Sequence, residues 1–300
     1  MKLLVTGGNG MVGSTIDADV RFASQECDLT NFNDTLAFFK KHSPEAVIHC
    51  AGKIGGVGIN SRLKGEFFYK NTMINTNVLE VSRLVGVKKL VCLLSTCIFP
   101  VEANYPLTSD QIHSGEPHPT SLGYSYSKRL AEIQIRTYRE QYGVNYVSIV
   151  PCNIYGPRDN FKIDEGHVVP SLIHKCYLAK KNNTPLKVWG TGKPQRELLY
   201  SQDAGDISTW ALNNYDGPEP LITSTSMEYS IKELVETIVD VMDFKGDIIW
   251  ETDKTDGQFR KPSDNTKFTE LNPDFKYTPL KEGVEKTVEW FIKNYDYARK

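Results

Sequence analysis

KLLVTGGNGMVG, residues 2–13, is the stretch that decides the fold of this chain. A short apolar run leads into three glycines, Gly7, Gly10 and Gly13, spaced as G-x-x-G-x-x-G. The first glycine permits a tight turn, the second lets the backbone approach a pyrophosphate, and the third allows close packing of a helix on the strand. The stretch therefore predicts a strand followed by a phosphate-binding turn, although a glycine triplet also occurs in ordinary strand–helix turns.

Short apolar runs recur after this stretch. Together with residues 2–6 they stand at 19–23, 46–50, 89–95 and 145–150, with helix-like segments between most of them. Such alternation indicates a parallel sheet with crossovers, and continuous apolar runs are typical of strands covered on both faces. We therefore expect an α/β chain with a Rossmann-type doubly wound parallel sheet.

The sequence changes character after about residue 155 and becomes richer in Gly, Pro, Asn and Asp. Helices are expected at 170–181, 203–214, 230–243 and 281–295. We expect residues 1–155 to form the dinucleotide-binding domain and residues 156–300 a smaller C-terminal substrate-binding lobe. The segment 197–225 could return to the first sheet, and spacing alone leaves this open.

The first crossover is unusually short. Only Ser14 to Ala18 separate Gly13 from the second apolar run. A crossover that carries a full helix needs at least about 10–12 residues. The first helix must therefore begin inside the glycine loop and be very short.

The end of the second strand bears on the choice of cofactor. An acid there would bind the ribose hydroxyls and repel a 2′-phosphate, which favours NAD. The sequence FASQECDL, residues 22–29, has no acid at Ala23–Gln25 and no arginine that would hold the phosphate. Asp28 fits the adenine edge of the cofactor or, equally, a helix cap before TNFND. The pattern disfavours strict use of NAD.

The composition excludes several classes of partner. The 300 residues include 35 basic and 37 acidic ones, a net charge of -2, and no long run of like charge marks a nucleic-acid or membrane-binding arm. No stretch approaches the ~20 apolar residues of a membrane span. The six cysteines form no C-x-x-C pair, so neither a disulfide framework nor a zinc site is favoured. We expect a cytoplasmic protein that acts on a small molecule.

Residues 123–143 read as a helix that ends at Gly143. Tyr124 and Lys128 are four residues apart and therefore share a face. An ammonium beside a phenol lowers the pKa of the phenol from about 10 toward a range where it exchanges protons. A chance Tyr/Lys pair on a solvated helix is an equally good reading of this spacing alone.

LLSTCIFP, residues 93–100, ends the fourth apolar run with a hydroxyl and a thiol. Ligands of a doubly wound sheet bind at the carboxyl ends of its strands. Ser95, Thr96 and Cys97 fall at such an end. We therefore expect Ser95 and Cys97 to face the cofactor cleft.

A glycine fingerprint, a serine at this strand end and a later Tyr-x-x-x-Lys resemble the extended short-chain dehydrogenase/reductase family over essentially the whole chain. Further motifs are similar to a branch of that family that acts on a GDP-linked keto sugar: STCIFP, GPRDNF and GHVVPSLIHK within 156–175, VWGTGKPQRELLYSQD at 188–203, and DGQFRK at 256–261. This resemblance implies NADPH-dependent 3,5-epimerisation and 4-reduction of GDP-4-keto-6-deoxy-D-mannose to GDP-L-fucose.

The resemblance also implies roles for five residues. Ser95 and Tyr124 donate to the substrate's carbonyl oxygen, and Tyr124 supplies the proton of the reduction. Lys128 also holds the nicotinamide ribose. Cys97 and His167 match an acid/base pair that inverts two carbons. A buried strand-end thiol and a helix-capping histidine remain alternative readings of the last two.

Binding residues follow from the same resemblance, which implies NADP(H) as the cofactor, requires no metal and suggests a homodimer formed through helices near 71–85 and 124–142. The implied cofactor contacts are Gly7, Gly8, Asn9, Gly10, Met11, Val12, Gly13, Ser24, Asp28, Leu29, Ala51, Leu94, Ser95, Tyr124, Lys128, Pro151, Asn153, Ile154 and His167. The implied substrate contacts are Asn153, Lys175, Trp189, Arg196, Asp256 and Lys261. Lys175 stands where bacterial members have arginine, so it can hold a phosphate only as a point charge.

Two other functions are compatible with parts of this pattern. One is a different nucleotide-sugar 4-epimerase or a reductase without epimerisation, and the presence of Cys97 with His167 argues against both. The other is a sensor that binds NADP without turnover. Such relatives usually lack the tyrosine or the lysine, whereas here Tyr124 and Lys128 are both present.

Overall fold

The structure is a computed structural model that describes residues 1–254 and 256–300. Within these residues, six parallel strands form the large sheet, in the order β2-β1-β3-β4-β5-β9. The strands are β1 (Leu3–Thr6), β2 (Val20–Phe22), β3 (Ala46–His49), β4 (Lys89–Leu93), β5 (Asn145–Val150) and β9 (Leu221–Ile222). The chain leaves β1 in one direction for β2 and then returns past it to β3, so the predicted doubly wound sheet is confirmed.

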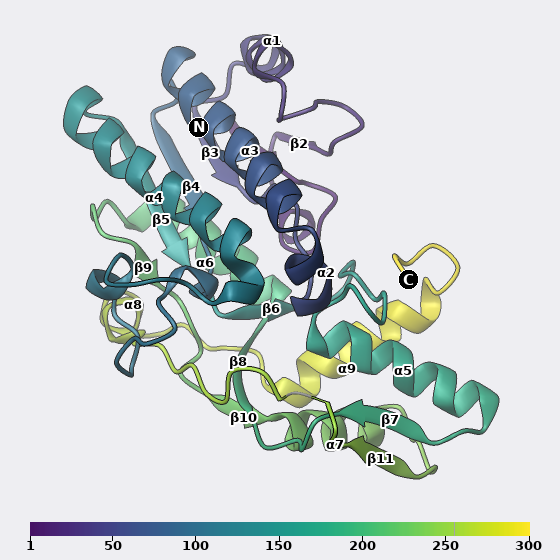
Figure 1. Cartoon of the computed structure of the whole chain (residues 1–300). Helices are drawn as coiled ribbons and strands as arrows, with labels where there is room; N and C mark the ends of the chain where they lie inside the picture. The colour runs from purple at the N-terminus through teal and green to yellow at the C-terminus, as the bar shows by residue number, and fades with distance from the viewer. Residues whose placement is uncertain (255) are drawn as a thin grey trace.

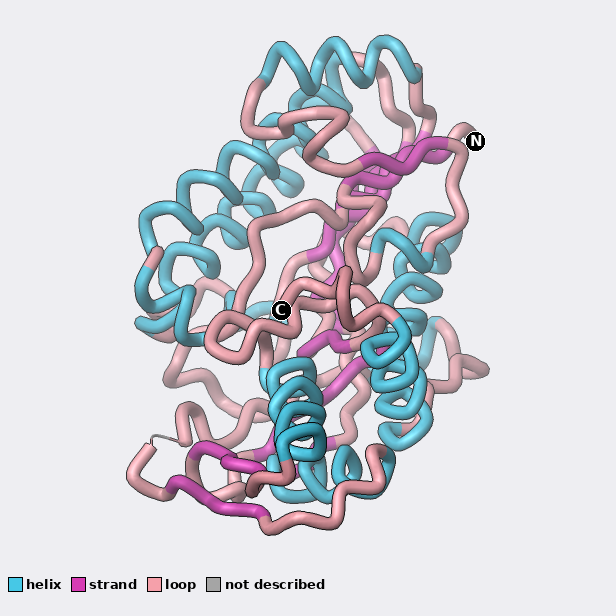
Figure 2. The backbone as a smooth tube through the Cα atoms, turned by 90° about the vertical axis from the view of Figure 1, so that its right-hand side faces the viewer, coloured by secondary structure: helices cyan, strands magenta, loops and turns pink. Residues whose placement is uncertain are grey.

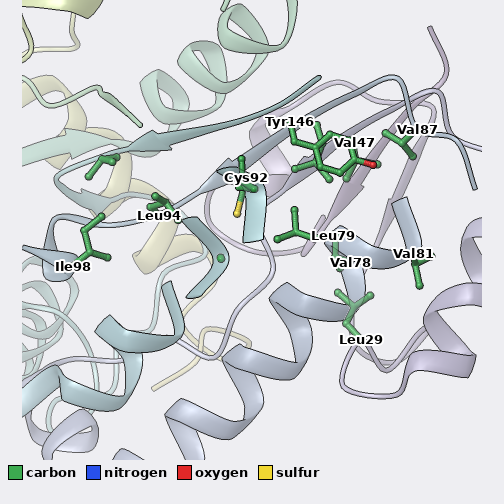
Figure 3. Packing of buried hydrophobic residues seen from close by; sticks show 14 of the residues in the cluster. Leu29, Val47, Val78, Leu79, Val81, Val87, Cys92, Leu94, Ile98 and Tyr146 are labelled. Atoms are coloured by element: carbon green, nitrogen blue, oxygen red, sulfur yellow. The ribbon is translucent and has the colours of Figure 1, made fainter. Parts of the chain in front are cut away.

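Helices cover both faces of this sheet (Figures 1 and 2). The helices α1 (Phe32–His42), α3 (Lys64–Leu84) and α4 (Leu122–Tyr142) lie on one face, and α6 (Ser201–Asn214) lies on the other. Figure 3 shows Val47, Cys92 and Tyr146 of the sheet beside Val78 and Leu79 of α3, all fully buried. These helices hold the carboxyl ends of the strands in one fixed row.

The first crossover contains only one turn of 3-10 helix, Gly13–Thr15, which confirms the expected very short helix. The hydroxyl of Thr15 donates to the carbonyl oxygen of Ser201 at the start of α6, at 3.4 Å. Phe22 of β2 is buried in the core beneath α1, whereas its neighbour Arg21 is exposed on the other face. The V-R-F alternation of β2 follows from this one-sided cover.

A second hydrophobic core lies in the C-terminal part of the chain. It contains two small sheets, one with the order β10-β8-β6 and one that pairs β11 with β7. Their strands are β6 (Asn153–Tyr155), β7 (Leu186–Trp189), β8 (Gln195–Tyr200), β10 (Glu228–Ser230) and β11 (Ile248–Glu251). The helices of this core are α5 (Val168–Asn182), α7 (Ile231–Val241) and α9 (Leu280–Lys293). Helix α8 (Thr266–Leu271) instead packs its Phe268 against α6 on the large sheet.

The segment 197–225 is divided between the two cores. Strand β8 pairs with β6 and β10, but α6 covers the large sheet and β9 extends it beside β5. The chain therefore returns to the first sheet after β8 and leaves it again after β9. A hydrogen bond from Thr223 N to Val150 O, 3.0 Å long, continues this pairing.

Two observations concern the chain as a whole. Among the described helices, none combines the length and the apolar character that crossing a membrane requires. All six cysteines are free thiols.

Candidate active site

The glycine loop after β1 has the geometry of a phosphate cradle. Gly7 adopts a left-handed conformation with φ of 67°, and a side chain there would meet the backbone of Ala51 at 3.0 Å. A side chain at Gly13 would overlap the carbonyl oxygen of Gly7. At Gly10 an added carbon would have only that oxygen within 4 Å, at 3.1 Å, so the outer side of the loop is accessible. The loop therefore fits a dinucleotide pyrophosphate.

The expected adenine edge follows β2. Ser24 and Asp28 line a hollow of about 470 Å³ together with Cys27, Phe38 and Lys41. The carboxylate of Asp28 accepts hydrogen bonds from the backbone N and the hydroxyl of Thr30, at 2.9 and 2.7 Å, and these bonds lower its pKa. Asp28 therefore closes a turn and does not cap α1. Lys41 brings a positive charge to this hollow, where Glu26 and Asp34 add to the negative charge of Asp28.

The N-terminus of α1 is capped by Asn31 instead. Its side chain accepts hydrogen bonds from the backbone N atoms of Asn33 and Asp34.

Ser95, Cys97 and Tyr124 meet at the carboxyl end of β4. The hydroxyl oxygen of Ser95 accepts a hydrogen bond from the backbone N of Cys97 at 3.2 Å. Ser95 also forms a side-chain hydrogen bond with Tyr124, and the thiol of Cys97 lies close enough to raise the pKa of that phenol. The strand end is held in place by a hydrogen bond from Leu94 N to Ile149 O at 2.8 Å.

Tyr124 and Lys128 lie on the first turns of α4 and are both buried. The ammonium of Lys128 donates to the carbonyl oxygen of Leu93 at 2.7 Å and lies 6.0 Å from the centre of the Tyr124 ring. The predicted lowering of the Tyr124 pKa is wrong. Burial raises this pKa, with a further contribution from Cys97, and the bond with Ser95 opposes them only in part. Burial also lowers the pKa of Lys128.

His167 stands at the N-cap position of α5 but makes no capping hydrogen bond with its side chain. The nearby carboxyl of Asp159 is buried; burial raises its pKa, and the charge of His167 opposes this rise. One carboxylate oxygen of Asp159 accepts from Asn160 N at 2.7 Å, and the other finds no hydrogen-bond partner among the described residues. Asp159 was not singled out from the sequence, although it stands within the quoted GPRDNF motif.

Lys175 and Trp189 lie together although they come from α5 and β7. The ammonium of Lys175 lies 4.7 Å from the centre of the Trp189 ring, and the indole is about half exposed. Arg196 of β8 donates to the carbonyl oxygen of Gln195 at 2.7 Å, and burial lowers its pKa. Lys175 and Trp189 thus put a cation beside an aromatic face, and Arg196 adds a cation near Asp256; these groups suit a base and a diphosphate.

Asp256 is already hydrogen-bonded. Its two carboxylate oxygens accept from the backbone N and the hydroxyl of Thr191, at 2.7 and 2.8 Å, and these bonds lower its pKa. The side chain thereby holds the loop after β7 against residues 256–261. A substrate group at Asp256 would have to share these oxygens.

Residues 256–264, which we call the bridging loop, connect this part of the chain to the first core. The hydroxyl of Tyr105 donates to Arg260 O at 2.8 Å, and Leu107 N donates to Pro262 O at 2.9 Å. Lys261 is thereby held, partly buried, close to the thiol of Cys97 and to Arg196; desolvation lowers its pKa, and the Cys97 interaction opposes the lowering. The loop therefore brings a cation to the end of β4.

The other residues expected to contact the cofactor lie along the same edge of the sheet. Gly8, Asn9, Met11 and Val12 belong to the glycine loop, Leu29 is buried near α1, Ala51 follows β3, Pro151 follows β5, and Asn153 and Ile154 lie on β6. Asn153 donates from its side chain to Glu197 O at 3.1 Å. Across the described residues, no group of three or more His, Cys, Asp or Glu side chains is arranged to hold a metal ion.

Comparison with known proteins agrees with this geometry. The profile of the NAD dependent epimerase/dehydratase family matches residues 3–223. A GDP-L-fucose synthase of Dictyostelium discoideum is 43% identical, and the match covers 99% of this chain and 97% of the relative. One of Escherichia coli is 32% identical, with 99% and 98% covered.

Solved structures give the same result. A GDP-L-fucose synthetase from Naegleria fowleri bound to NADP has a TM-score of 0.94 and 38% identity, with 99% of this chain and 94% of that chain covered. Because both the sequence match and the structural match run the length of the chain, the protein belongs to the NAD dependent epimerase/dehydratase family, in the branch that contains the GDP-L-fucose synthases.

Proposed function

We propose that this chain converts GDP-4-keto-6-deoxy-D-mannose to GDP-L-fucose with NADPH. The observation that carries the proposal is the meeting of Ser95, Cys97, Tyr124 and Lys261 at the end of β4. A hydroxyl pair, a thiol and a cation at this edge suit a substrate whose ketone first acidifies neighbouring hydrogens and is then reduced. The named relatives, which are GDP-L-fucose synthases over their whole length, support the same reaction.

NADPH, when bound, supplies the hydride that reduces carbon 4. The glycine loop would hold its pyrophosphate. Lys128, on α4, would bind the nicotinamide ribose. The hollow that contains Ser24 and Lys41 would receive the adenosine end. A bound NADP in a structural neighbour supports this use of the site.

The epimerisation depends on protons at the two carbons beside the ketone. Ser95 and Tyr124 would donate hydrogen bonds to the oxygen on which enolate charge develops, which makes those carbons acidic. Cys97 and His167 would then remove and return protons on opposite faces of the sugar. The ammonium of Lys261 lies close to the Cys97 thiol, on the side where the sugar would bind.

The reduction requires a proton for the new hydroxyl. Because burial raises the pKa of Tyr124, the phenol keeps its proton at neutral pH and is ready to donate it. The hydrogen bond with Ser95 orients the phenol for this transfer. The proposed role of Tyr124 is therefore that of a general acid.

The GDP group would lie against residues of the second core. Arg196, Lys175 and Lys261 would neutralise the diphosphate, and Trp189 would offer a stacking surface. Asn153 and Asp256 would contact the sugar nucleotide at the border. In this proposal residues 1–155 with the returning segment bind NADPH, and residues 156–300 form the substrate-binding lobe.

The proposal includes a homodimer in the cytoplasm. Phe68 of α3 and Leu130 and Ile133 of α4 are exposed apolar residues on helices that pack together on the outer face of the sheet (Figure 1). Pairing of two such faces would bury them. The six free thiols suit a reducing compartment.

The decisive experiment mixes purified protein with GDP-4-keto-6-deoxymannose and NADPH. We expect oxidation of NADPH and a product that nuclear magnetic resonance identifies as GDP-L-fucose. In deuterated water, deuterium should enter carbons 3 and 5, which a simple reductase would not cause. Turnover of UDP-galactose without turnover of the keto sugar would overturn the assignment.

A further inference from the structure

A chain of buried hydrogen bonds runs from the base of the glycine loop to the helix that carries Tyr124 and Lys128. The backbone N of Ala51 donates to Thr6 Oγ1 at 3.1 Å. Thr6 Oγ1 lies 2.7 Å from His49 Nδ1, and His49 Nε2 lies 3.0 Å from Asn75 Oδ1. Asn75 Nδ2 then donates to the carbonyl oxygen of Ser127 at 3.2 Å. The side chains of Thr6, His49 and Asn75 are at most 1% exposed.

The two ends of this hydrogen-bond chain fix which atom donates and which accepts in every one of its bonds. Asn75 must turn its NH₂ group to the carbonyl of Ser127, so its oxygen faces His49 and can only accept. His49 Nε2 therefore carries a proton, and Nδ1 of the neutral ring accepts one from the hydroxyl of Thr6. That hydroxyl in turn accepts from Ala51 N. One arrangement satisfies all these groups, which makes the chain rigid.

His49 stays neutral in this environment. Burial and the nearby ammonium of Lys128 lower its pKa to about 3, with a small opposing contribution from the bond to Asn75. A charged ring would need a second acceptor at Nδ1 and would repel Lys128. The chain therefore keeps one protonation state throughout the neutral pH range.

The two ends of this hydrogen-bond chain are attached to the two halves of the candidate site. Thr6 directly precedes Gly7, and Gly7 rests on the backbone of Ala51 so closely that a side chain would meet it at 3.0 Å. At the other end, Ser127 directly precedes Lys128, and its hydroxyl donates to the carbonyl oxygen of Tyr124 at 2.7 Å. His49 links these two ends through its two ring nitrogens.

We propose that His49 is a positioning residue that fixes the glycine loop relative to Tyr124 and Lys128. It acts through Thr6 on the cofactor side and through Asn75 on the helix side. The inference rests on the proposed function, because it concerns the geometry between bound cofactor and proton donor. A histidine that merely fills the core would affect the free energy of unfolding alone.

Two substitutions of His49 break the hydrogen-bond chain at one end each. His49→Asn places a polar group where Nδ1 was and keeps the contact with Thr6, but it is too short to reach Asn75. His49→Gln reaches Asn75 and loses Thr6. Loss of one buried hydrogen bond typically changes an equilibrium about tenfold. We expect His49→Gln to raise the Kd of NADPH about tenfold at nearly constant kcat. We expect His49→Asn to lower kcat about tenfold and to raise Kd by a smaller factor, because the helix end that it releases carries both Tyr124 and the ribose-binding Lys128.

Thr6→Val is the second test, because it keeps the shape of the side chain and leaves His49 in place. It should raise the Kd of NADPH as His49→Gln does. The matched control is Thr287→Val on α9, whose buried hydroxyl donates to Gly283 O within its own helix. This control should change stability but neither Kd nor kcat.

The Kd is measured by NADPH fluorescence without any sugar. Failure of the wild-type protein to convert the keto sugar would therefore sink the proposed function while the effects of Thr6→Val and His49→Gln on Kd still decide the positioning role. Equal effects of His49→Asn and His49→Gln on Kd and kcat would refute the positioning role. So would variants that change only the melting temperature and leave both constants as in the wild type. If neither His49 variant folds, an unchanged Kd in Thr6→Val refutes it. Nitrogen resonances of the wild-type ring should show a proton on Nε2 and no titration near neutral pH.

Discussion

Tyr124 and Glu197 show how burial changes the chemistry of single residues in this protein. Burial raises the pKa of both, which keeps a proton on the phenol and brings the carboxyl into the neutral range. Spacing in the sequence placed Tyr124 and Lys128 on one face of a helix, but it did not predict that the ammonium would bind Leu93 O. The residue types indicated the chemistry. The direction of each pKa shift follows from how the side chain is packed.

Cys97→Ser tests the proposed proton transfer. A hydroxyl releases its proton far less readily than a thiol, so deuterium from the solvent should enter the sugar roughly a hundredfold more slowly. The affinity for NADPH should change little, because residue 97 would contact the sugar. The measurement is proton resonance of the product formed in deuterated water.

Cys176→Ala is the matched control for the loss of a thiol, since Cys176 is buried in the second core. It should lower the melting temperature without slowing deuterium entry. An equal loss of NADPH affinity and deuterium entry in Cys97→Ser would contradict a role as proton carrier.

Glu197→Gln tests the cost of a buried carboxyl. Burial raises the Glu197 pKa from 4.5 to about 7, while hydrogen bonds from Ser263 lower it in part and the charge of Glu228 opposite on β10 raises it. The folded state therefore retains a proton that the unfolded chain has lost, so wild-type stability falls as pH rises from about 4.5 to about 7. The glutamine lacks this fall.

The melting temperature of Glu197→Gln relative to the wild type should therefore be higher at about pH 8 than at about pH 5. Calorimetry at these two values measures the difference. A difference that is the same at both would show that Glu197 is ionised in the folded protein at both values.

At the scale of elements, local signals were sufficient where they are strong. Helix α4 covers Leu122–Tyr142, and Gly143 ends it with a φ of 64°, as a glycine after a helix predicts. The short first crossover was also expected from a simple residue count. The strands β6, β8 and β10 were not expected as a separate sheet, because three to six residues in loop-rich sequence carry too little periodicity to identify their partners.

Ser230→Ala tests how helix α7 begins. The hydroxyl of Ser230 accepts from Glu233 N at 3.1 Å, and Glu233 accepts from Ser230 N at 2.7 Å, which completes a capping box. Loss of the cap should cost about 1 kcal/mol and lower the melting temperature by about 2–4 °C. Thr237→Ala in the same helix removes an exposed hydroxyl that bonds only Glu233 O, and it should have no such effect. Equal melting temperatures of Ser230→Ala and the wild type would contradict the importance of the cap.

At the scale of the whole molecule, the fold class was predictable but the assembly of the site was not. The glycine loop and the end of β4 lie in one row because any parallel sheet aligns its carboxyl ends. Lys261 reaches Cys97 only through the bridging loop, and Asp159 reaches His167 only through the packing before α5. Such contacts depend on two cores placed together, which no local pattern describes.

The oligomeric state is a testable property of the outer face of α3 and α4. We expect the protein to sediment at twice the 33.9 kDa mass of one chain. Leu130→Asp with Ile133→Asp would place charges on exposed apolar positions of α4 and should give a monomer. Ile249→Asp changes an equally exposed apolar residue on β11 and should leave the sedimentation unchanged. A wild-type protein that sediments as a single chain would contradict the proposed dimer.

The bridging loop also has a thermodynamic consequence. It follows β11 along the chain, yet it hydrogen-bonds Tyr105 and Leu107 beside the large sheet. A nucleotide sugar held by Lys261 and Arg196 would therefore touch both cores at once. Its binding energy would be lost if either core melted by itself, so a ligand should couple their unfolding into one cooperative event.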